Sequence, residues 1–178
     1  RISDHLVMKK RSAVDAGVNT TNWRRTDMIW PLAEDHHNIY RESNFLKACR
    51  GEPVDYTPIW LMRQAGRYQR EFREMRATVD FLDLCKTPEL ATEVTLMATE
   101  RLGVDAAIIF SDILPILQPM GFDLEYVSGT GPVIHNPLRS GTAVNQIPEV
   151  DAQSLAYVYE AIRMTRRALP PTIPLIGF

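Results

Sequence analysis

A near-continuous apolar run at residues 104–110 follows directly on a helix signal, and this succession constrains the fold more than any other feature of the chain. Thr87 and Pro88 form a favourable N-cap and N1 pair, and apolar residues then recur at helical spacing until Gly103. The run that follows is typical of a parallel strand covered on both faces. A further apolar run at residues 57–62 precedes the helix. Strand, helix and strand in this order predict a right-handed βαβ unit and an α/β protein.

The remaining segments extend this α/β pattern. Ser43 is placed to cap a short helix through Arg50, and another short helix is expected at residues 71–77. A Gly- and Pro-rich stretch holds two candidate hairpin strands, at residues 124–127 and 133–135. A long helix at residues 152–168 and a third buried strand at 173–178 follow. Three strands cannot close a barrel, so we expect an α/β series that continues beyond this sequence.

Composition and charge bound the class of protein. Of the 178 residues, 45% are apolar and 24% charged, as in a folded domain rather than a disordered chain. The formal net charge of −2 argues against non-specific nucleic-acid binding. The sequence lacks both a signal sequence and the run of about 18 to 20 apolar residues that crosses a bilayer, so no membrane contact and a cytoplasmic location are expected. Residues 1–40 show no sustained period and are predicted to be a poorly ordered arm, distinct from a main domain at 41–178.

The sequence predicts no metal site. Cys49 and Cys85 lack the spacing of metal ligands, and the adjacent His36 and His37 have diverging side chains. His135 lies in the Gly- and Pro-rich stretch and is expected to be a surface residue.

Candidate functional residues follow the first two predicted strands. Arg63, Gln64, Ala65, Gly66, Arg67 and Tyr68 come directly after residues 57–62, and Asp112 comes just after residues 104–110. The carboxyl ends of parallel strands face one side of a sheet, where catalytic groups gather. Because arginine binds carboxylates through two parallel hydrogen bonds, Arg63 and Arg67 beside an acid suggest a substrate with several carboxylates and a donor or positive centre. The alternative is that these arginines are surface residues paired with Glu71 or Glu74.

Four stretches resemble the uroporphyrinogen decarboxylase family. They are PIWLMRQAGRY at residues 58–68, LCKTPEL at 84–90, FSDIL at 110–114 and GTGP at 129–132, and the resemblance covers residues 43–178. It implies the N-terminal part of a (β/α)8 TIM barrel, incomplete in this chain, from a commonly dimeric enzyme. Such enzymes convert uroporphyrinogen III to coproporphyrinogen by removing four acetate carboxyl groups, with no metal or organic cofactor.

The resemblance also implies roles for residues. Residues 63–68, from Arg63 to Tyr68, would bind substrate together with Asp112, the two arginines at its carboxylate rim and Asp112 at its pyrrole N–H groups. Asp112 would stabilise the positive charge of a protonated pyrrole, and Arg63 is the other catalytic candidate, with a bridging water or a substrate carboxyl as alternative proton donors. Gln64 would contact substrate or orient Arg67, and Tyr68 would contact substrate or pack on the loop. A corrinoid-linked methyltransferase of the same fold and a non-catalytic binder of tetrapyrroles or other polycarboxylates remain as alternatives.

Overall fold

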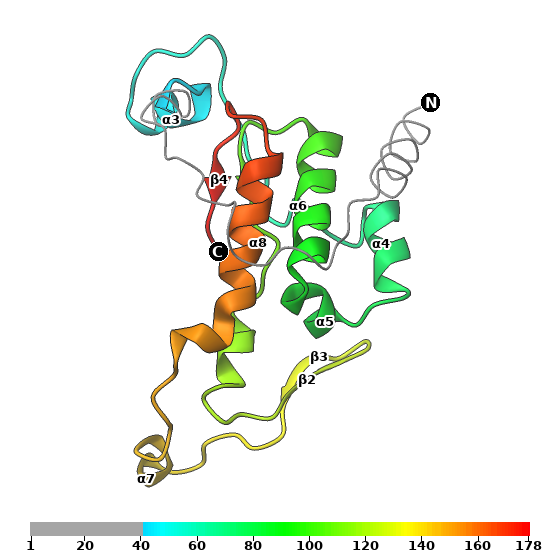
Figure 1. Cartoon of the computed structure of the whole chain (residues 1–178), viewed down its shortest axis with the longest axis vertical. Coiled ribbons are helices and arrows are strands. Elements are labelled where there is room, and N and C mark those ends of the chain that lie inside the picture. Colours follow the sequence, from blue (N-terminus) through cyan, green and yellow to red (C-terminus); the bar gives the residue numbers. More distant parts are fainter. Residues whose placement is uncertain (1–40) are drawn as a thin grey trace, which may run out of the picture. The chain divides into compact units, whose positions relative to one another are not determined.

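A computed structural model describes residues 41–178 of the chain (Figure 1). The predicted arm at 1–40, with His36 and His37, lies outside the described residues. The helices are α3 (Asn44–Cys49), α4 (Arg70–Arg76), α5 (Phe81–Lys86), α6 (Pro88–Leu102), α7 (Gly141–Val144) and α8 (Ala156–Ala168), with short 3-10 helices at Leu114–Leu117 and Ala152–Leu155. The strands are β1 (Ala107–Ile108), β2 (Leu124–Val127), β3 (Gly131–Ile134) and β4 (Leu175–Ile176).

Helix α6 has the predicted boundaries, but the hydroxyl of Thr87, the residue before it, does not form the predicted cap. Pro88 opens the helix and Gly103 ends it with φ of 61°, a left-handed conformation that favours glycine. The Thr87 hydroxyl does not cap α6, because it donates to the Asp83 carbonyl at 2.7 Å. Asp83 belongs to α5, a six-residue helix that the sequence did not predict. The hydroxyl therefore links the end of α5 to the start of α6.

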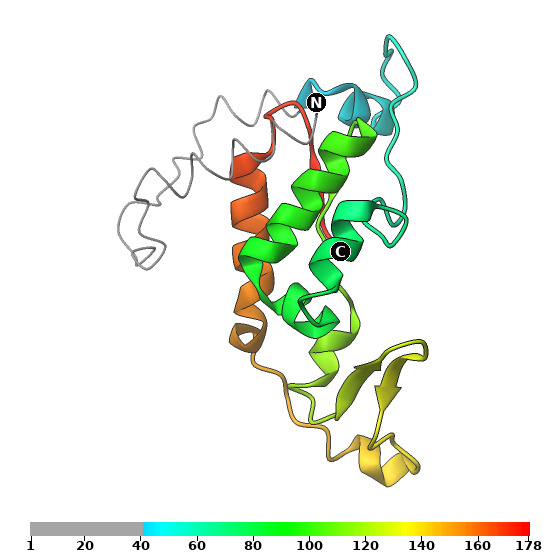
Figure 2. The same ribbon diagram turned by 90° about the vertical axis from the view of Figure 1, so that its right-hand side faces the viewer.

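Helices α6 and α8 lie side by side (Figures 1 and 2), and buried threonines join them. Thr92 donates to the carbonyl of Ala161 at 3.3 Å and accepts from Thr165 at 3.2 Å. Thr95 donates to the Ala91 carbonyl of its own helix and accepts the backbone N–H of Phe110 at 2.9 Å. These hydroxyls satisfy polar groups that would otherwise be costly to bury. Through Thr95, α6 fixes the point at which the chain leaves β1 toward Asp112.

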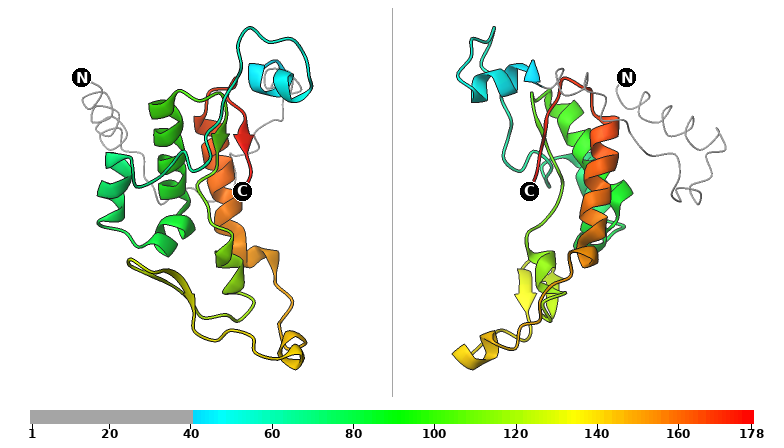
Figure 3. Two further views of the ribbon diagram at one scale, coloured as in Figure 1. Left: turned by 180° about the vertical axis from the view of Figure 1, so that it is seen from behind. Right: turned by 60° about the vertical axis from the view of Figure 1, so that its left-hand side comes forward.

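The βαβ unit predicted from residues 57–62, the helix and residues 104–110 is not formed among the described residues, because 57–62 is not a strand. A parallel pair is formed instead by β1 and β4 (Figure 3). Ala107 pairs with Leu175 and Ile108 with Ile176, and α8 belongs to the connection between the two strands. The strand predicted at 104–110 is thus confirmed, but only Ala107–Ile108 have strand geometry. The strand predicted at 173–178 is also short, and the prediction that it is buried was wrong: both β4 residues are half-buried and Phe178 is 63% exposed.

The prediction of a buried strand at 57–62 was wrong. This segment is extended, but Ile59, Trp60, Leu61 and Met62 are all exposed, with Met62 79% exposed. It is held beside the start of β1 by Asp105, whose N–H donates to the Ile59 carbonyl and whose Oδ2 accepts the Ile59 N–H, both at 2.8 Å. Within the described chain, these two bonds from Asp105 stand in place of the backbone ladder that would join two strands. Within the described part of the chain no layer covers the outer apolar side chains, so they stay in contact with solvent.

The hairpin prediction is confirmed, with its second strand starting at Gly131 instead of Val133. β2 and β3 are antiparallel, with Tyr126 opposite Pro132. The hairpin is closed at its base, where Asn136 accepts the Asp123 N–H at 2.7 Å and donates to the Gly121 carbonyl at 2.9 Å. The alternating burial along β2 turns Tyr126 to the same side as the buried Leu124.

Two small clusters form the core. Phe72, Leu84 and Val94 make the first, with Ala65 and Phe110 packed against it. Ala91, Ile109 and Ala161 make the second, between α6, α8 and the strand segment. Phe110 touches both clusters, so the segment that carries Asp112 leaves from the junction of the two.

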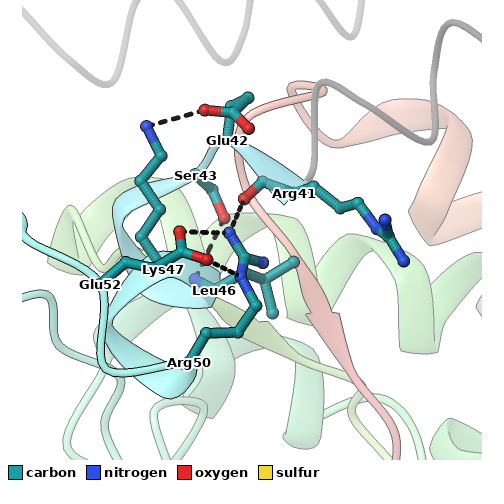
Figure 4. A network of polar contacts seen from close by, with 7 residues as sticks. All are labelled: Arg41, Glu42, Ser43, Leu46, Lys47, Arg50 and Glu52. Carbon is teal, nitrogen blue, oxygen red and sulfur yellow. Dashed lines mark hydrogen bonds and ion pairs between the residues drawn. The ribbon is translucent and has the colours of Figure 1, made fainter.

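Helix α3, at the start of the described chain, carries a local network of polar contacts (Figure 4). The Ser43 hydroxyl accepts the Leu46 N–H at 3.3 Å, which confirms the predicted N-cap. Arg50 binds Glu52 through Nε and Nη2 and donates to the Arg41 carbonyl. These contacts are exposed and serve the local turn after the helix.

Candidate functional site

The loop that follows the extended segment is held in a specific conformation. Arg63 has φ of 56°, the one positive φ of a non-glycine residue in the described part of the chain, and the Gln64 N–H donates to the Leu61 carbonyl at 3.1 Å. Gly66, the glycine of this loop, has no positive φ. Backbone strain of this kind is typical of sites whose geometry is set by function.

Gly66 is instead a position of close packing. A Cβ at this position would lie 3.1 and 3.2 Å from two carbons of the Tyr68 ring. The Tyr68 hydroxyl donates to the Gln64 carbonyl, so the ring spans the loop and covers Gly66. Tyr68 is nevertheless 60% exposed. Of the two roles considered for Tyr68, packing on the loop is the one that the structure contains.

Two buried glutamines lie on the inside of the loop. Gln69 is 2% exposed; its Oε1 accepts the Gly66 N–H at 3.2 Å and its own N–H donates to the Gly66 carbonyl at 3.0 Å. Gln64 is 1% exposed, and neither of its amide atoms has a partner in the part of the chain that the structure describes. Ala65 between them packs on the first core cluster. The loop is therefore anchored from below while its arginines face outward.

The arginines divide into two groups. Arg70 pairs with Glu74 at 2.7 Å, and Arg73 donates to the carbonyls of Arg67 and Tyr68, so these two stabilise α4 and the loop before it. Arg76 donates to the Val79 carbonyl and lies over the Phe81 ring. Glu71 is bound by Arg101 at 2.8 Å. The two acids considered as partners for Arg63 and Arg67 are thus already paired with other arginines.

Arg63 and Arg67 themselves are exposed, and within residues 41–178 no acidic side chain pairs with either. Two guanidinium groups four positions apart on a rigid loop offer fixed pairs of N–H donors to carboxylates from solution. The local charge excess is therefore available to a ligand.

Asp112 is half-buried, and two hydrogen bonds orient it. Its Oδ1 accepts the Leu114 N–H and the Tyr126 hydroxyl, both at 2.8 Å. Its Oδ2 has no hydrogen-bond partner within the described chain. The first contact begins the 3-10 helix that follows, and the second comes from the hairpin. One carboxylate oxygen is thus committed to the protein and the other can accept a donor from a ligand.

The groups around Asp112 show a low-polarity environment. Burial raises the pKa of the Tyr126 phenol well above its ordinary value, and the hydrogen bond to Asp112 and the negative charge of Asp112 raise this pKa further. Burial and the same charge raise the pKa of the Cys85 thiol to about 12. The Tyr126 ring lies on Phe81 with 4.6 Å between centroids, and Phe81 meets Phe110 edge-on. A wall of aromatic rings therefore lies beside Asp112.

The two halves of the candidate site are connected through the core. Ala65, in the arginine loop, and Phe110, two residues before Asp112, pack on the same cluster. Within residues 41–178 no hydrogen bond or ion pair joins Arg63 or Arg67 directly to Asp112. A cavity elsewhere, lined by Asn44, Tyr56 and Asp105 among others, contains none of the predicted site residues.

Sequence reasoning missed three residues that shape this region: Tyr126, Gln69 and Asp105. Tyr126 sits in a hairpin and its partner Asp112 is 14 residues away, so no local pattern predicted the contact. The alternation of Leu124 and Tyr126 along β2 could have marked both as inward-facing.

His135 pairs with Glu125 at 2.7 Å on the outer surface, as expected of a surface residue. Among residues 41–178 no cluster of three metal-ligating side chains occurs, and no helix there is long and apolar enough to cross a membrane.

Comparison with known proteins gives a consistent family match. The profile of the uroporphyrinogen decarboxylase (URO-D) family matches residues 40–178. Uroporphyrinogen decarboxylase of Roseiflexus sp. is 53% identical over 137 residues, covering 76% of this chain and 39% of the relative. The enzyme of Dictyostelium discoideum is 49% identical over 140 residues, covering 78% of this chain and 38% of the relative. The chain thus spans about two fifths of the length of these relatives.

A solved structure resembles the fold. A methyltransferase from Methanosarcina mazei superposes with a TM-score of 0.54 at 20% sequence identity, covering 75% of this chain and 40% of that chain. At this identity the likeness concerns the fold alone and favours neither chemistry. It supports a TIM-barrel-like α/β arrangement for the described part of the chain.

Proposed function

Because the chain belongs to the uroporphyrinogen decarboxylase family, we propose that the protein removes the four acetate carboxyl groups of uroporphyrinogen III to give coproporphyrinogen. The relatives at about 50% identity carry this name. The observation that supports the proposal most is the half-bound carboxylate of Asp112, whose Oδ2 is open to a donor while Oδ1 is fixed by Leu114 and Tyr126.

The substrate has the chemistry that the two halves of the site can bind. Uroporphyrinogen carries eight carboxylates on its rim and four pyrrole N–H donors at its centre. Arg63 and Arg67, with no acidic partner among the described residues, would bind rim carboxylates. Gln64, Ala65, Gly66 and Tyr68 complete the binding loop. Asp112 Oδ2 would accept pyrrole N–H groups.

The reaction needs an acceptor for the electrons that CO2 leaves behind. Protonating the ring carbon next to the acetate-bearing position makes the pyrrole cationic, and the electrons of the breaking C–C bond then neutralise it as CO2 leaves. The exocyclic methylene that results takes up a proton to become the methyl group, and the ring carbon loses the proton it had gained. A carboxylate already fixed beside the ring stabilises the cation without reorganising during the step. Asp112 fits this role because two hydrogen bonds set its orientation and the aromatic wall reduces solvent screening.

Arg63 is the second residue proposed to be catalytic. An arginine is a poor acid at its usual pKa of about 12 or higher, so Arg63 would act by holding a water or a substrate carboxyl that delivers the proton. Its positive φ sets the direction in which the side chain leaves the loop. Cofactor-free chemistry, a complete (β/α)8 barrel, a homodimer and a cytoplasmic location are further parts of the proposal, carried by the family alone.

The experiment compares Asp112→Ala with Asp123→Ala in the full-length protein. Asp123 is an exposed acid next to β2 whose backbone holds the hairpin base, so it is a charge-matched control. Conversion of uroporphyrinogen is followed anaerobically by chromatography of the oxidised porphyrins, and binding by calorimetry. We expect Asp112→Ala to lower kcat by about 100- to 1000-fold, the usual loss of one preorganised electrostatic group.

Each alternative has a distinct result. Unchanged turnover in Asp112→Ala would remove the role given to this carboxylate. Tight binding of uroporphyrinogen by the parent protein without any conversion would indicate a non-catalytic binding protein. Methyl transfer to or from a corrinoid, without decarboxylation, would favour the methyltransferase.

A further inference from the structure

The hairpin β2–β3 contributes one side chain, Tyr126, to Asp112, and the reaction described above uses it only through the orientation of the carboxylate. The Tyr126 hydroxyl donates to Asp112 Oδ1 at 2.8 Å. The alternation along β2 turns Leu124 and Tyr126 inward, while Glu125 and Val127 are exposed. The phenol therefore meets the carboxylate because of the register of the strand.

We propose that Tyr126 is a positioning residue for Asp112: its hydroxyl holds Oδ1 so that Oδ2 faces the pyrrole N–H groups of the substrate. This inference rests on the proposed function. The Leu114 N–H alone fixes only one direction at Oδ1, and a carboxylate can still rotate about its Cβ–Cγ bond when it accepts a single bond. Two donors of different origin, one from the chain that follows Asp112 and one from the hairpin, remove that freedom.

Tyr126 is itself held on several sides. Its ring packs on Phe81 with 4.6 Å between centroids. Its backbone lies in the ladder opposite Pro132. The hairpin is closed at its base by Asn136 and at its tip by the Thr130 N–H, which donates to the Val127 carbonyl at 3.1 Å. A donor that is fixed by packing and by the ladder transmits its position to the acceptor, as supporting residues around an active site do.

The contact also lies in a place where a hydroxyl is costly unless it has a partner. Tyr126 is half-buried beside Phe81, and Cys85 is buried close enough for the charge of Asp112 to raise the pKa of its thiol. In such surroundings a hydrogen bond to a charged group is stronger than in water.

The test is a double-mutant cycle in the full-length protein with Tyr126→Phe and Asp112→Ala. Phenylalanine keeps the ring that packs on Phe81 and removes only the hydroxyl. We expect Tyr126→Phe to lower kcat by about tenfold, the factor that corresponds to loss of about 1.4 kcal/mol. KM should change by less than about twofold, because the rim arginines are untouched. Tyr159→Phe, on the exposed side of α8, is the matched control and should behave as the parent.

The cycle separates positioning from other roles. If Tyr126 acts through Asp112, adding Tyr126→Phe to Asp112→Ala lowers the residual single-turnover rate no further. An equal tenfold loss in both backgrounds would overturn the inference, since Tyr126 would then act independently of Asp112. Parent-like kcat in Tyr126→Phe, with Asp112→Ala impaired, would also overturn it while leaving the proposed function intact. A loss explained by a lower melting temperature, rather than by kcat at full folding, would mark the hydroxyl as structural.

Discussion

Replacing Gly66 by alanine tests whether the arginine loop depends on the close approach of the Tyr68 ring. Gly66 has no positive φ, so alanine is compatible with its backbone. The added Cβ would lie 3.1 and 3.2 Å from two ring carbons and 3.5 Å from the Arg63 carbonyl oxygen. Ordinary contacts begin near 3.4 Å, so the ring must move by a few tenths of an ångström. The exposed ring can do so, but its hydroxyl is bound to the Gln64 carbonyl.

The size of the effect follows from that one bond. Losing a neutral hydrogen bond costs about 0.5–1.5 kcal/mol, which corresponds to about two- to tenfold in an equilibrium constant. Because this bond spans the residues between the two arginines, we expect Gly66→Ala to raise the KM for uroporphyrinogen by about two- to tenfold. The kcat should change less, since Asp112 is on another segment. Initial-rate assays on the full-length protein measure both.

A second variant identifies the cause. In a Tyr68→Ala background the ring is absent, so Gly66→Ala should cause no further rise in KM. If Gly66→Ala raises KM by the same factor with and without the Tyr68 ring, the steric explanation is wrong. If Gly66→Ala behaves as the parent, the loop does not depend on this contact.

Two further predictions concern charge and ionisation. Arg67→Lys should raise the KM for uroporphyrinogen by about tenfold, because lysine keeps the charge but loses the paired N–H donors. The control Arg70→Lys should leave KM unchanged, because Arg70 pairs with Glu74. Equal KM values in both variants would make Arg67 structural. The pKa of the Cys85 thiol is raised in the folded state from its ordinary 9.0 to about 12, so the unfolded protein ionises first and stability should fall as pH rises from about 9 to about 12. Chemical denaturation in this range should show a shallower decline for Cys85→Ala, and an unchanged slope would contradict the burial of this thiol.

The sequence predicted the helices and the hairpin well because their signals are local. Ser43 caps its helix, Pro88 and Gly103 bound α6, and the Gly-rich turn before Gly131 gives the hairpin. Helices α5 and α7 were missed because they have six and four residues, too few to show a helical period, whereas the equally short α3 was recognised from its Ser43 cap. Residues 57–62 were predicted to be buried because apolar composition indicates a capacity for burial. Composition does not identify the layer that provides the burial, and among the described residues it is Asp105 that holds this segment, through two hydrogen bonds to Ile59.

The identity of the candidate site residues could be predicted from the sequence, but their conformations and contacts could not. The arginine motif and the acid after residues 104–110 can be read from the sequence, because both follow apolar runs. The conformation of the loop could not be predicted: the strained residue is Arg63, and Gly66 is needed for the Tyr68 ring. Tyr126 could not be predicted either, since its contact with Asp112 depends on the register of a hairpin.

A crystal structure of the full-length protein with coproporphyrinogen bound under reducing conditions would show directly whether Asp112 faces the pyrroles. We expect Asp112 Oδ2 within about 2.7–3.2 Å of pyrrole nitrogens, with Oδ1 still bound by Tyr126. We also expect propionate groups on the guanidinium groups of Arg63 and Arg67. A product whose pyrrole nitrogens face other groups, with Asp112 outside hydrogen-bond distance, would show that the role given to Asp112 is wrong.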